Sequence, residues 1–149
     1  IAGKAVAFKE AMSEEFRRDQ IQTVKNAKAL CRSLKERDFD IVSGGTDNHL
    51  MLVNLNKMHI TGKDAEAALS KAGIIANKNT VPFETRSPFI TSGIRLGTPA
   101  CTTRGMQETE MELIAYYIET AIKNAANERL LLEISGEVRE LCSKYPVYC

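Results

Sequence analysis

An excess of one charge, long apolar runs and closely spaced cysteines are all missing from this sequence. Lysine and arginine number 20 against 19 aspartate and glutamate residues, which leaves a net charge of +1. Without a basic excess, the chain cannot rely on electrostatics to bind nucleic acid. No apolar stretch approaches the ~20 residues that a membrane-spanning helix needs. We therefore expect neither nucleic acid nor a membrane as a partner.

Metal-binding motifs are missing as well. The 4 cysteines stand at positions 31, 101, 142 and 149, none of them in a CxxC pair, and only 2 histidines accompany them. We therefore expect no metal site, because zinc ligands normally come in closely spaced pairs. Scattered cysteines in a chain of this size are typical of reduced thiols, which predicts a cytoplasmic protein. Cys31 and Cys142 fall on apolar helical faces, where they serve as small core residues.

The chain begins Ile-Ala-Gly-Lys and not with methionine. Its first residues do not have the charged and then apolar pattern of a signal peptide. Either the N-terminus has been processed or the sequence is a piece of a longer chain, and composition alone leaves both open.

The content of the sequence is that of one folded domain with an extended helical start. Its 149 residues are 44% hydrophobic and 26% charged. A chain of this length and composition can form a hydrophobic core that needs no disulfide or metal to stabilise it. Residues 4–37 are predicted to be helical, either as two helices or as one with a break, because a helix start follows Ser13. Beyond it, apolar residues recur every three or four positions and form one helical stripe: Ile21, Val24, Ala27, Cys31 and Leu34.

The middle of the chain alternates strands and turns. Residues 39–43 and 50–55 are predicted to form a hairpin with a long loop. A helix is predicted to begin at Thr61, which caps it, and to stop at Gly73. A short strand is expected at residues 74–76, then an irregular loop over residues 77–92, then a strand over residues 92–98 that stops at Pro99.

Two further helices complete the prediction, one beginning after Met106 and one ending before Pro146. The order of elements predicts an α+β fold in which helices cover one face of a small, mainly antiparallel sheet. No internal repeat or linker indicates a second domain.

Arg95 is a candidate binding residue. Side chains alternate along a strand, so if Ile94 and Leu96 point into the core, Arg95 points away from it, with Gly93 and Gly97 on its own face. We expect these glycines to leave open space around a guanidinium that can hold a carboxylate or phosphate with two hydrogen bonds. The alternative is an arginine in an ion pair with an acidic residue at the edge of the core.

The irregular segment offers a second candidate site. Asn77 and Asn79 provide amides, and Ser87, Pro88 and Phe89 provide backbone groups beside an aromatic ring. That combination suits a flat heterocycle with polar edges. Ordinary turn chemistry explains asparagine and proline equally well.

Several long motifs resemble one family. They are Ser43-Gly-Gly-Thr-Asp-Asn-His49 with the following Leu-Met-Leu-Val-Asn-Leu, Asn77-Lys-Asn-Thr-Val-Pro82, and Ser87-Pro-Phe-Ile-Thr-Ser-Gly-Ile-Arg-Leu-Gly-Thr-Pro-Ala100. Together with the two ends of the chain, they resemble serine hydroxymethyltransferase, most closely its bacterial form, over essentially the whole sequence.

The resemblance implies a fold and a reaction. The family is a pyridoxal-phosphate enzyme of the aspartate-aminotransferase-like fold type I, which interconverts serine and tetrahydrofolate with glycine and methylenetetrahydrofolate. It implies that residues 1–37 are a helix leading from a large domain absent here, and that residues 38–149 are the C-terminal small domain. The cofactor lysine and most of the cofactor site would belong to that large domain, and the enzyme would be a homodimer.

The resemblance also implies roles for individual residues. Arg95 matches the arginine that binds the substrate carboxylate, and Asn79 matches the asparagine that hydrogen-bonds the pterin ring. Ser87, Pro88 and Phe89 match the loop that lines the folate site. No catalytic residue is implied in this chain, which would be inactive alone. The competing hypothesis is a non-catalytic ligand-binding or interaction domain that reuses the same module.

Overall fold

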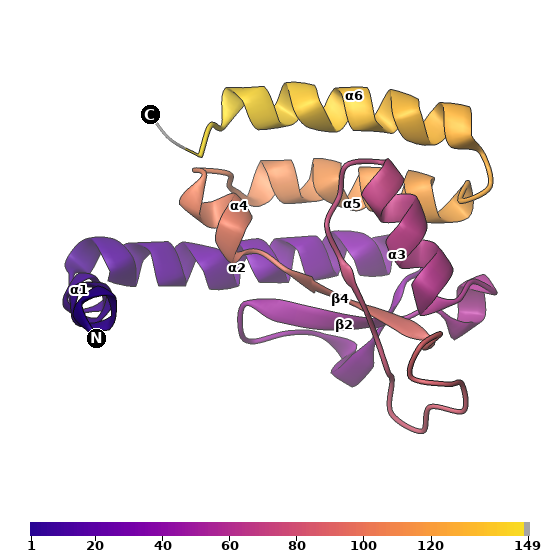
Figure 1. The fold of residues 1–149 in the computed structure, drawn as a ribbon, viewed down its shortest axis with the longest axis horizontal. Coiled ribbons are helices and arrows are strands. Elements are labelled where there is room, and N and C mark those ends of the chain that lie inside the picture. Colours follow the sequence, from indigo (N-terminus) through magenta and orange to yellow (C-terminus); the bar gives the residue numbers. More distant parts are fainter. Residues whose placement is uncertain (148–149) are drawn as a thin grey trace.

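The computed structural model describes residues 1–147, so Tyr148 and Cys149, at the C-terminal end that contributes to the family resemblance, lie outside the described residues. Helices open and close the chain, and short strands with one helix between them make up its middle (Figure 1). The helices are α1 (Ala2–Ala11), α2 (Glu14–Glu36), α3 (Gly62–Lys71), α4 (Pro99–Thr103), α5 (Glu108–Lys123) and α6 (Glu128–Lys144). The strands are β1 (Asp40–Ile41), β2 (Leu50–Asn54), β3 (Asn77–Asn79) and β4 (Gly93–Gly97), with short 3₁₀ turns η1 (Val42–Gly44) and η2 (Asn56–Met58).

The strands form one antiparallel sheet in the order β1-β2-β4-β3. In its register Met51 faces Leu96 and Val53 faces Ile94, and all four side chains are buried. Residues one position along each strand point to the opposite face, because strand side chains alternate. One face of the sheet therefore meets the core, and we call the other the open face.

Helices α2 to α6 lie on the core side of the sheet, and α1 does not contact it. In Figure 1, α2, α5 and α6 run roughly alongside one another above β2, and α3 crosses in front of β4. Their apolar faces share one core with the sheet, in which Leu34, Leu69, Met111 and Leu131 are fully buried. This is the predicted α+β arrangement with helices on one face of an antiparallel sheet.

The predicted helix boundaries near Ser13, Thr61 and Gly73 are confirmed. The Ser13 hydroxyl accepts a hydrogen bond from the Phe16 N–H at 3.1 Å, which starts α2 and separates it from α1. The Thr61 hydroxyl accepts from the Asp64 N–H at 3.0 Å. Gly73 follows the end of α3 with φ of +79°, a conformation that glycine adopts without steric cost.

Two local predictions were wrong. Residues 74–76 form no strand, because the Ile74 N–H donates to the Leu69 carbonyl at the end of α3 and Ile75 lies on the surface. The strand begins instead at Asn77, inside the segment predicted to be wholly irregular, where it gains β4 as a partner. The short helix α4 was also missed, because Pro99 ends β4 and at the same time opens a helix as its first residue.

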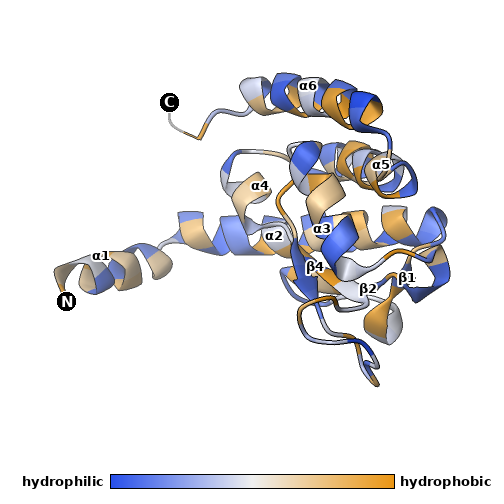
Figure 2. Ribbon diagram, turned by 45° about the vertical axis from the view of Figure 1, so that its right-hand side comes forward, coloured by the Kyte–Doolittle hydropathy of each residue, from blue (hydrophilic) through white to orange (hydrophobic). Residues whose placement is uncertain are grey.

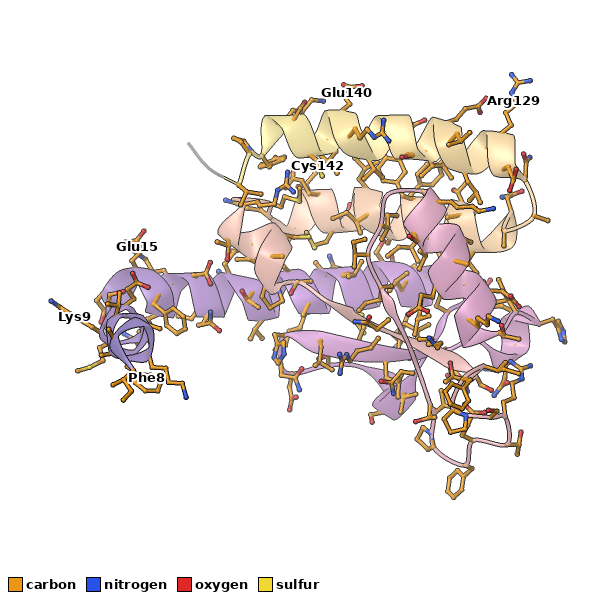
Figure 3. All side chains as sticks on the ribbon, in the orientation of Figure 1. Phe8, Lys9, Glu15, Arg129, Glu140 and Cys142 are labelled. Carbon is orange, nitrogen blue, oxygen red and sulfur yellow. The ribbon has the colours of Figure 1, made fainter. Side chains whose placement is uncertain are left out.

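Helix α1 stands apart from the rest of the molecule. Figure 2 shows it extending away from the body, and none of its residues is buried. Phe8 is 69% exposed and Val6 57% exposed, and Met12 beyond the helix is 88% exposed. In Figure 3, Phe8 and Lys9 project from it with no other element beside them. Its apolar residues do not gather along one stripe, and charged residues are interspersed among them.

Within residues 1–147, no helix is both long and apolar enough to cross a membrane.

Candidate binding site on the open sheet face

Arg95 lies in the middle of β4 on the open face. Ile94 is fully buried and Leu96 nearly so, while Arg95 between them is exposed, as the strand pattern predicted. Among residues 1–147, no carboxylate forms an ion pair with its guanidinium, so the ion-pair alternative is wrong for this structure. The guanidinium is left with its donors directed to solvent, available to an anion.

The sheet register brings Asn77 and Asn79 to the same face. Asn77 pairs with Arg95 and Asn79 pairs with Gly93, so both asparagines belong to the same face of the sheet as Arg95. Asn79 and Arg95 are diagonal neighbours across the ladder, which places their Cα atoms roughly 7–8 Å apart. A cation and an amide, taken from two candidate sites in the sequence, thus stand side by side on one surface.

The glycines beside Arg95 have a different role from the one predicted. A Cβ at Gly93 would lie 2.7 Å from the Val53 carbonyl oxygen and 2.7 Å from a methyl group of Val81. At Gly97 the nearest atom would be the His49 carbonyl oxygen, at 3.3 Å. Gly93 therefore lets β4 pack closely against the backbone of β2 and against the loop that precedes β4. It does not provide open space for the guanidinium.

Residues 80–92 connect β3 to β4 and carry Ser87, Pro88 and Phe89. All three are exposed, and the Phe89 ring is 81% exposed. The Ser87 carbonyl accepts hydrogen bonds from the N–H groups of Ile90 and Thr91, at 2.9 and 3.0 Å, which turns the chain back toward the sheet. The loop follows Asn79, the last residue of β3, and leads directly into β4, the strand that carries Arg95.

The same loop contains a strained turn. The Glu84 N–H donates to the Val81 carbonyl at 3.1 Å, and Phe83, the third residue of this turn, has φ of +60°. Glycine is the usual residue at such a position after proline. Phe83 is 99% exposed. A bulky residue in this conformation requires its surroundings to impose it.

Glu84 supplies that constraint, and sequence reasoning missed it. Its carboxylate accepts from the Ser92 N–H at 2.7 Å and the Ser92 hydroxyl at 2.7 Å. It also accepts from the N–H groups of Arg86 at 2.9 Å and Thr85 at 3.1 Å. The sequence did carry a signal for this role: Glu84 is the one acidic residue in the loop over residues 80–92, and the backbone N–H groups of that loop need acceptors.

These contacts alter the acidity of Glu84. Burial of the carboxylate is the largest single influence and raises its pKa. The hydrogen bonds from Arg86, Ser92 and Val81 together outweigh burial and lower the pKa of Glu84 to about 2, from an ordinary 4.5. The group is therefore a fixed anion that acts only as an acceptor.

No lysine of the strands shares the open face with Arg95. Lys78 is the one lysine in the four strands, and it pairs with Ile94 on the core side. Its ammonium contacts Glu66 of α3 at 3.1 Å, and its backbone N–H donates to the same carboxylate and lowers the Glu66 pKa. The open face of the strands therefore presents the Arg95 guanidinium and the amides of Asn77 and Asn79, and no strand lysine.

Burial disfavours two of the three described thiols as nucleophiles. Cys31, Cys101 and Cys142 are free, and burial raises the pKa of Cys31 and of Cys101. Cys31 is a core residue and Cys142 packs against the core, as predicted. Within residues 1–147 no three acidic, histidine or cysteine side chains gather as metal ligands would.

Comparison with known proteins gives this surface a context. The family model described as serine hydroxymethyltransferase matches residues 1–118. The chain belongs to the serine hydroxymethyltransferase family. Arg95, Asn79 and residues 87–89 all fall inside the part that matches the serine hydroxymethyltransferase model.

A similar curated protein extends the match to the whole chain. It is the serine hydroxymethyltransferase of Methanosarcina barkeri (strain Fusaro / DSM 804), 81% identical over 149 residues. The match covers 100% of this chain but only 36% of the relative, so the chain spans about a third of that hydroxymethyltransferase.

Proposed function

We propose that this chain acts as part of a serine hydroxymethyltransferase that interconverts serine and tetrahydrofolate with glycine and 5,10-methylenetetrahydrofolate. In this proposal it supplies the group that binds the amino-acid carboxylate and part of the folate site. The observation that carries the proposal is the shared open face of β3 and β4, on which Arg95, without an ion pair among residues 1–147, and the amide of Asn79 are diagonal neighbours.

Arg95 binds the carboxylate of serine or glycine in this proposal. Its planar guanidinium matches a carboxylate with two parallel hydrogen bonds. A substrate held in this way has its Cα bonds fixed in direction, which is how a binding residue contributes to rate. The β4 strand is suited to the task because its flanking residues Ile94 and Leu96 are anchored in the core.

Asn79, with Ser87, Pro88 and Phe89, binds the pterin ring. The Asn79 side-chain N–H already donates to the Thr80 carbonyl at 2.8 Å, which leaves its oxygen to accept from a ring N–H. Phe89 presents an exposed ring beside the exposed backbone of the loop. An aromatic face combined with polar edges is the usual composition of a heterocycle site.

The residues of the open face do not fit pyridoxal phosphate, because no strand lysine lies there to form the Schiff base. We therefore assign the cofactor to the part of the enzyme that only the longer relative covers, and no step of the reaction to this chain alone. The isolated chain is accordingly expected to show no turnover.

Helix α1 supports a contact between this chain and the part of the enzyme that only the longer relative covers. Among residues 1–147, nothing covers its exposed apolar side chains Val6 and Phe8. We propose that residues 1–37 lead from a large domain, with α1 lying against it, and that residues 38–149 form the C-terminal small domain. Helix α2 also contributes Ala27, Leu30 and Leu34 to the small-domain core. The resemblance further implies a cytoplasmic homodimer, which cell fractionation and sedimentation of the complete enzyme would test.

The test uses the complete enzyme, meaning the polypeptide that contains these residues together with the large domain. Arg95→Ala is expected to raise the KM for serine about a hundredfold or more, since a charged hydrogen-bonding pair is worth roughly 1.5–3 kcal/mol per bond. Arg95→Lys should recover only part of this loss, because lysine lacks the planar fork. Asn79→Ala should raise the KM for tetrahydrofolate about tenfold and leave the KM for serine unchanged.

Arg129→Ala is the matched control, since Arg129 projects from the outer face of α6 (Figure 3) and, within residues 1–147, pairs only with Glu133 on the surface. It should leave both KM values unchanged. An Arg95→Ala enzyme with an ordinary KM for serine would refute the proposal, and so would measurable turnover by the 149-residue chain alone.

A further inference from the structure

The loop over residues 80–92 has little apolar packing to hold it. Its outer residues are exposed, including Phe83 and Phe89, and of its apolar side chains only Val81 is buried. Fixing one residue's backbone costs roughly 1–2 kcal/mol in conformational entropy, so a 13-residue connection needs specific bonds to keep one shape. Besides the turn at Ser87 and a 3.4 Å hydrogen bond from the Arg86 guanidinium to the Ile60 carbonyl, those bonds come from two places.

The first is the start of α3. The Gly62 N–H donates to the Thr91 carbonyl at 3.0 Å, and the Lys63 N–H donates to the Ile90 carbonyl at 3.0 Å. A Cβ on Gly62 would clash with the Thr91 hydroxyl and the Gly93 carbonyl, so the loop end lies directly on the helix start. This anchors the end of the loop but does not shape its middle.

The second is the Glu84 carboxylate. Its donors stand on both sides of it in the sequence, from Val81 near the loop start to Ser92 at its end. The Glu84 side chain therefore links the two ends of the loop by hydrogen bonds and also fixes the strained turn that contains Phe83. Because its oxygens are directed to the loop's own N–H and O–H groups, they are not directed to a ligand.

We propose that Glu84 is a positioning residue for the folate site, holding residues 87–89 in the arrangement that binds the ring beside Asn79 without touching the ring itself. This inference rests on the proposed function and adds a residue to it. Glu84 differs from a merely stabilising residue in one respect: its loss should weaken folate binding selectively, because the loop changes shape while the strand that carries Arg95 stays in the core.

The experiment compares Glu84→Gln with Glu110→Gln in the complete enzyme. Glu110 is a matched carboxylate: it accepts a backbone hydrogen bond from Gln107 at 2.8 Å at the start of α5, and its pKa is also lowered. Glu84→Gln is expected to raise the KM for tetrahydrofolate about tenfold, the effect of losing one charge-assisted bond, with less than a twofold change in the KM for serine. Glu84→Asp should recover part of the loss, and Glu110→Gln should change neither KM.

Ser92→Ala provides a second route if Glu84→Gln does not fold. It removes only the hydroxyl donor at 2.7 Å and keeps the backbone bond. It should raise the KM for tetrahydrofolate in the same selective way, by a few-fold. Circular dichroism and thermal unfolding of each variant establish that it is folded.

An unchanged KM for tetrahydrofolate in a folded Glu84→Gln enzyme overturns the inference. Equal losses for serine and folate also overturn it, since they indicate a structural role only. The Asn79→Ala enzyme separates this failure from failure of the proposed function. If Asn79→Ala weakens folate binding and Glu84→Gln does not, only the inference about Glu84 fails, whereas no effect from Asn79→Ala means that the folate site lies elsewhere.

Discussion

Gly93 offers a sharp test of how the site is assembled, because it is where β4 passes closest to its neighbours. The change is Gly93→Ala, which adds one methyl group. That methyl would lie 2.7 Å from the Val53 carbonyl oxygen, 2.7 Å from Val81 and 3.1 Å from the Asn79 carbonyl oxygen. Two of these three atoms belong to the backbones of the paired strands, so relief requires the strands to separate.

The magnitude follows from two opposing effects. Overpacking of this kind costs about 2–3 kcal/mol, and replacing glycine gains about 0.5–1 kcal/mol by restricting the unfolded chain. The net loss in the free energy of unfolding is about 1–2.5 kcal/mol. At about 3 °C per kcal/mol for a domain of this length, the Tm should fall by about 3–8 °C.

Gly136→Ala is the matched control for the same chemical change. Gly136 lies inside α6, and a Cβ there would have no heavy atom within 4 Å. Alanine is favoured over glycine in a helix by about 1 kcal/mol, so the Tm should rise by a few degrees. Thermal unfolding followed by circular dichroism measures both. A Gly93→Ala chain as stable as Gly136→Ala would refute the assignment of Gly93 to close strand packing.

Two further predictions concern stability. The folded pKa of Glu84 is about 2, below its ordinary 4.5, so its carboxylate stabilises the fold above pH 4.5 and that contribution is lost as the pH falls from 4.5 toward 2. Urea unfolding of the native chain and of Glu84→Gln should therefore differ at pH 6 and converge toward pH 3, and a gap that stays constant contradicts this. Asn26 is fully buried and donates to the Thr102 hydroxyl and the Met106 carbonyl, each at 2.9 Å. Asn26→Ala should lower the free energy of unfolding by about 2–3 kcal/mol, because it leaves these acceptors unpaired; an unchanged urea midpoint would count against that network.

The sequence predicted the parts of the fold that depend on local patterns. The capping hydroxyls of Ser13 and Thr61 and the stop at Gly73 act through neighbouring backbone groups, and each was found where it was expected. The outward orientation of Arg95 followed from the alternation of strand side chains, because its neighbours Ile94 and Leu96 are both buried. These features need only a few adjacent residues to specify them.

The missed features depend on partners far along the chain. β3 consists of Asn77, Lys78 and Asn79, which have little intrinsic strand preference, and it exists because β4 pairs with it and Glu66 binds Lys78. The apolar Ile74 and Ile75 were the better local candidates, but the end of α3 uses the amide of Ile74. The role of Glu84 likewise required knowing which amides the loop leaves without partners.

The way Asn79 and Arg95 are brought together has a consequence for variation within the family. Their common face is set by the ladder between β3 and β4, in which Asn79 pairs with Gly93, and not by the length of the connection between them. Residues can be inserted into or removed from the connection without moving either side chain to the other face, since parity is counted along each strand. Under the proposed function, a change in the length of the connection would therefore alter the contacts to folate and leave Arg95, which holds the amino acid, on its face of the sheet.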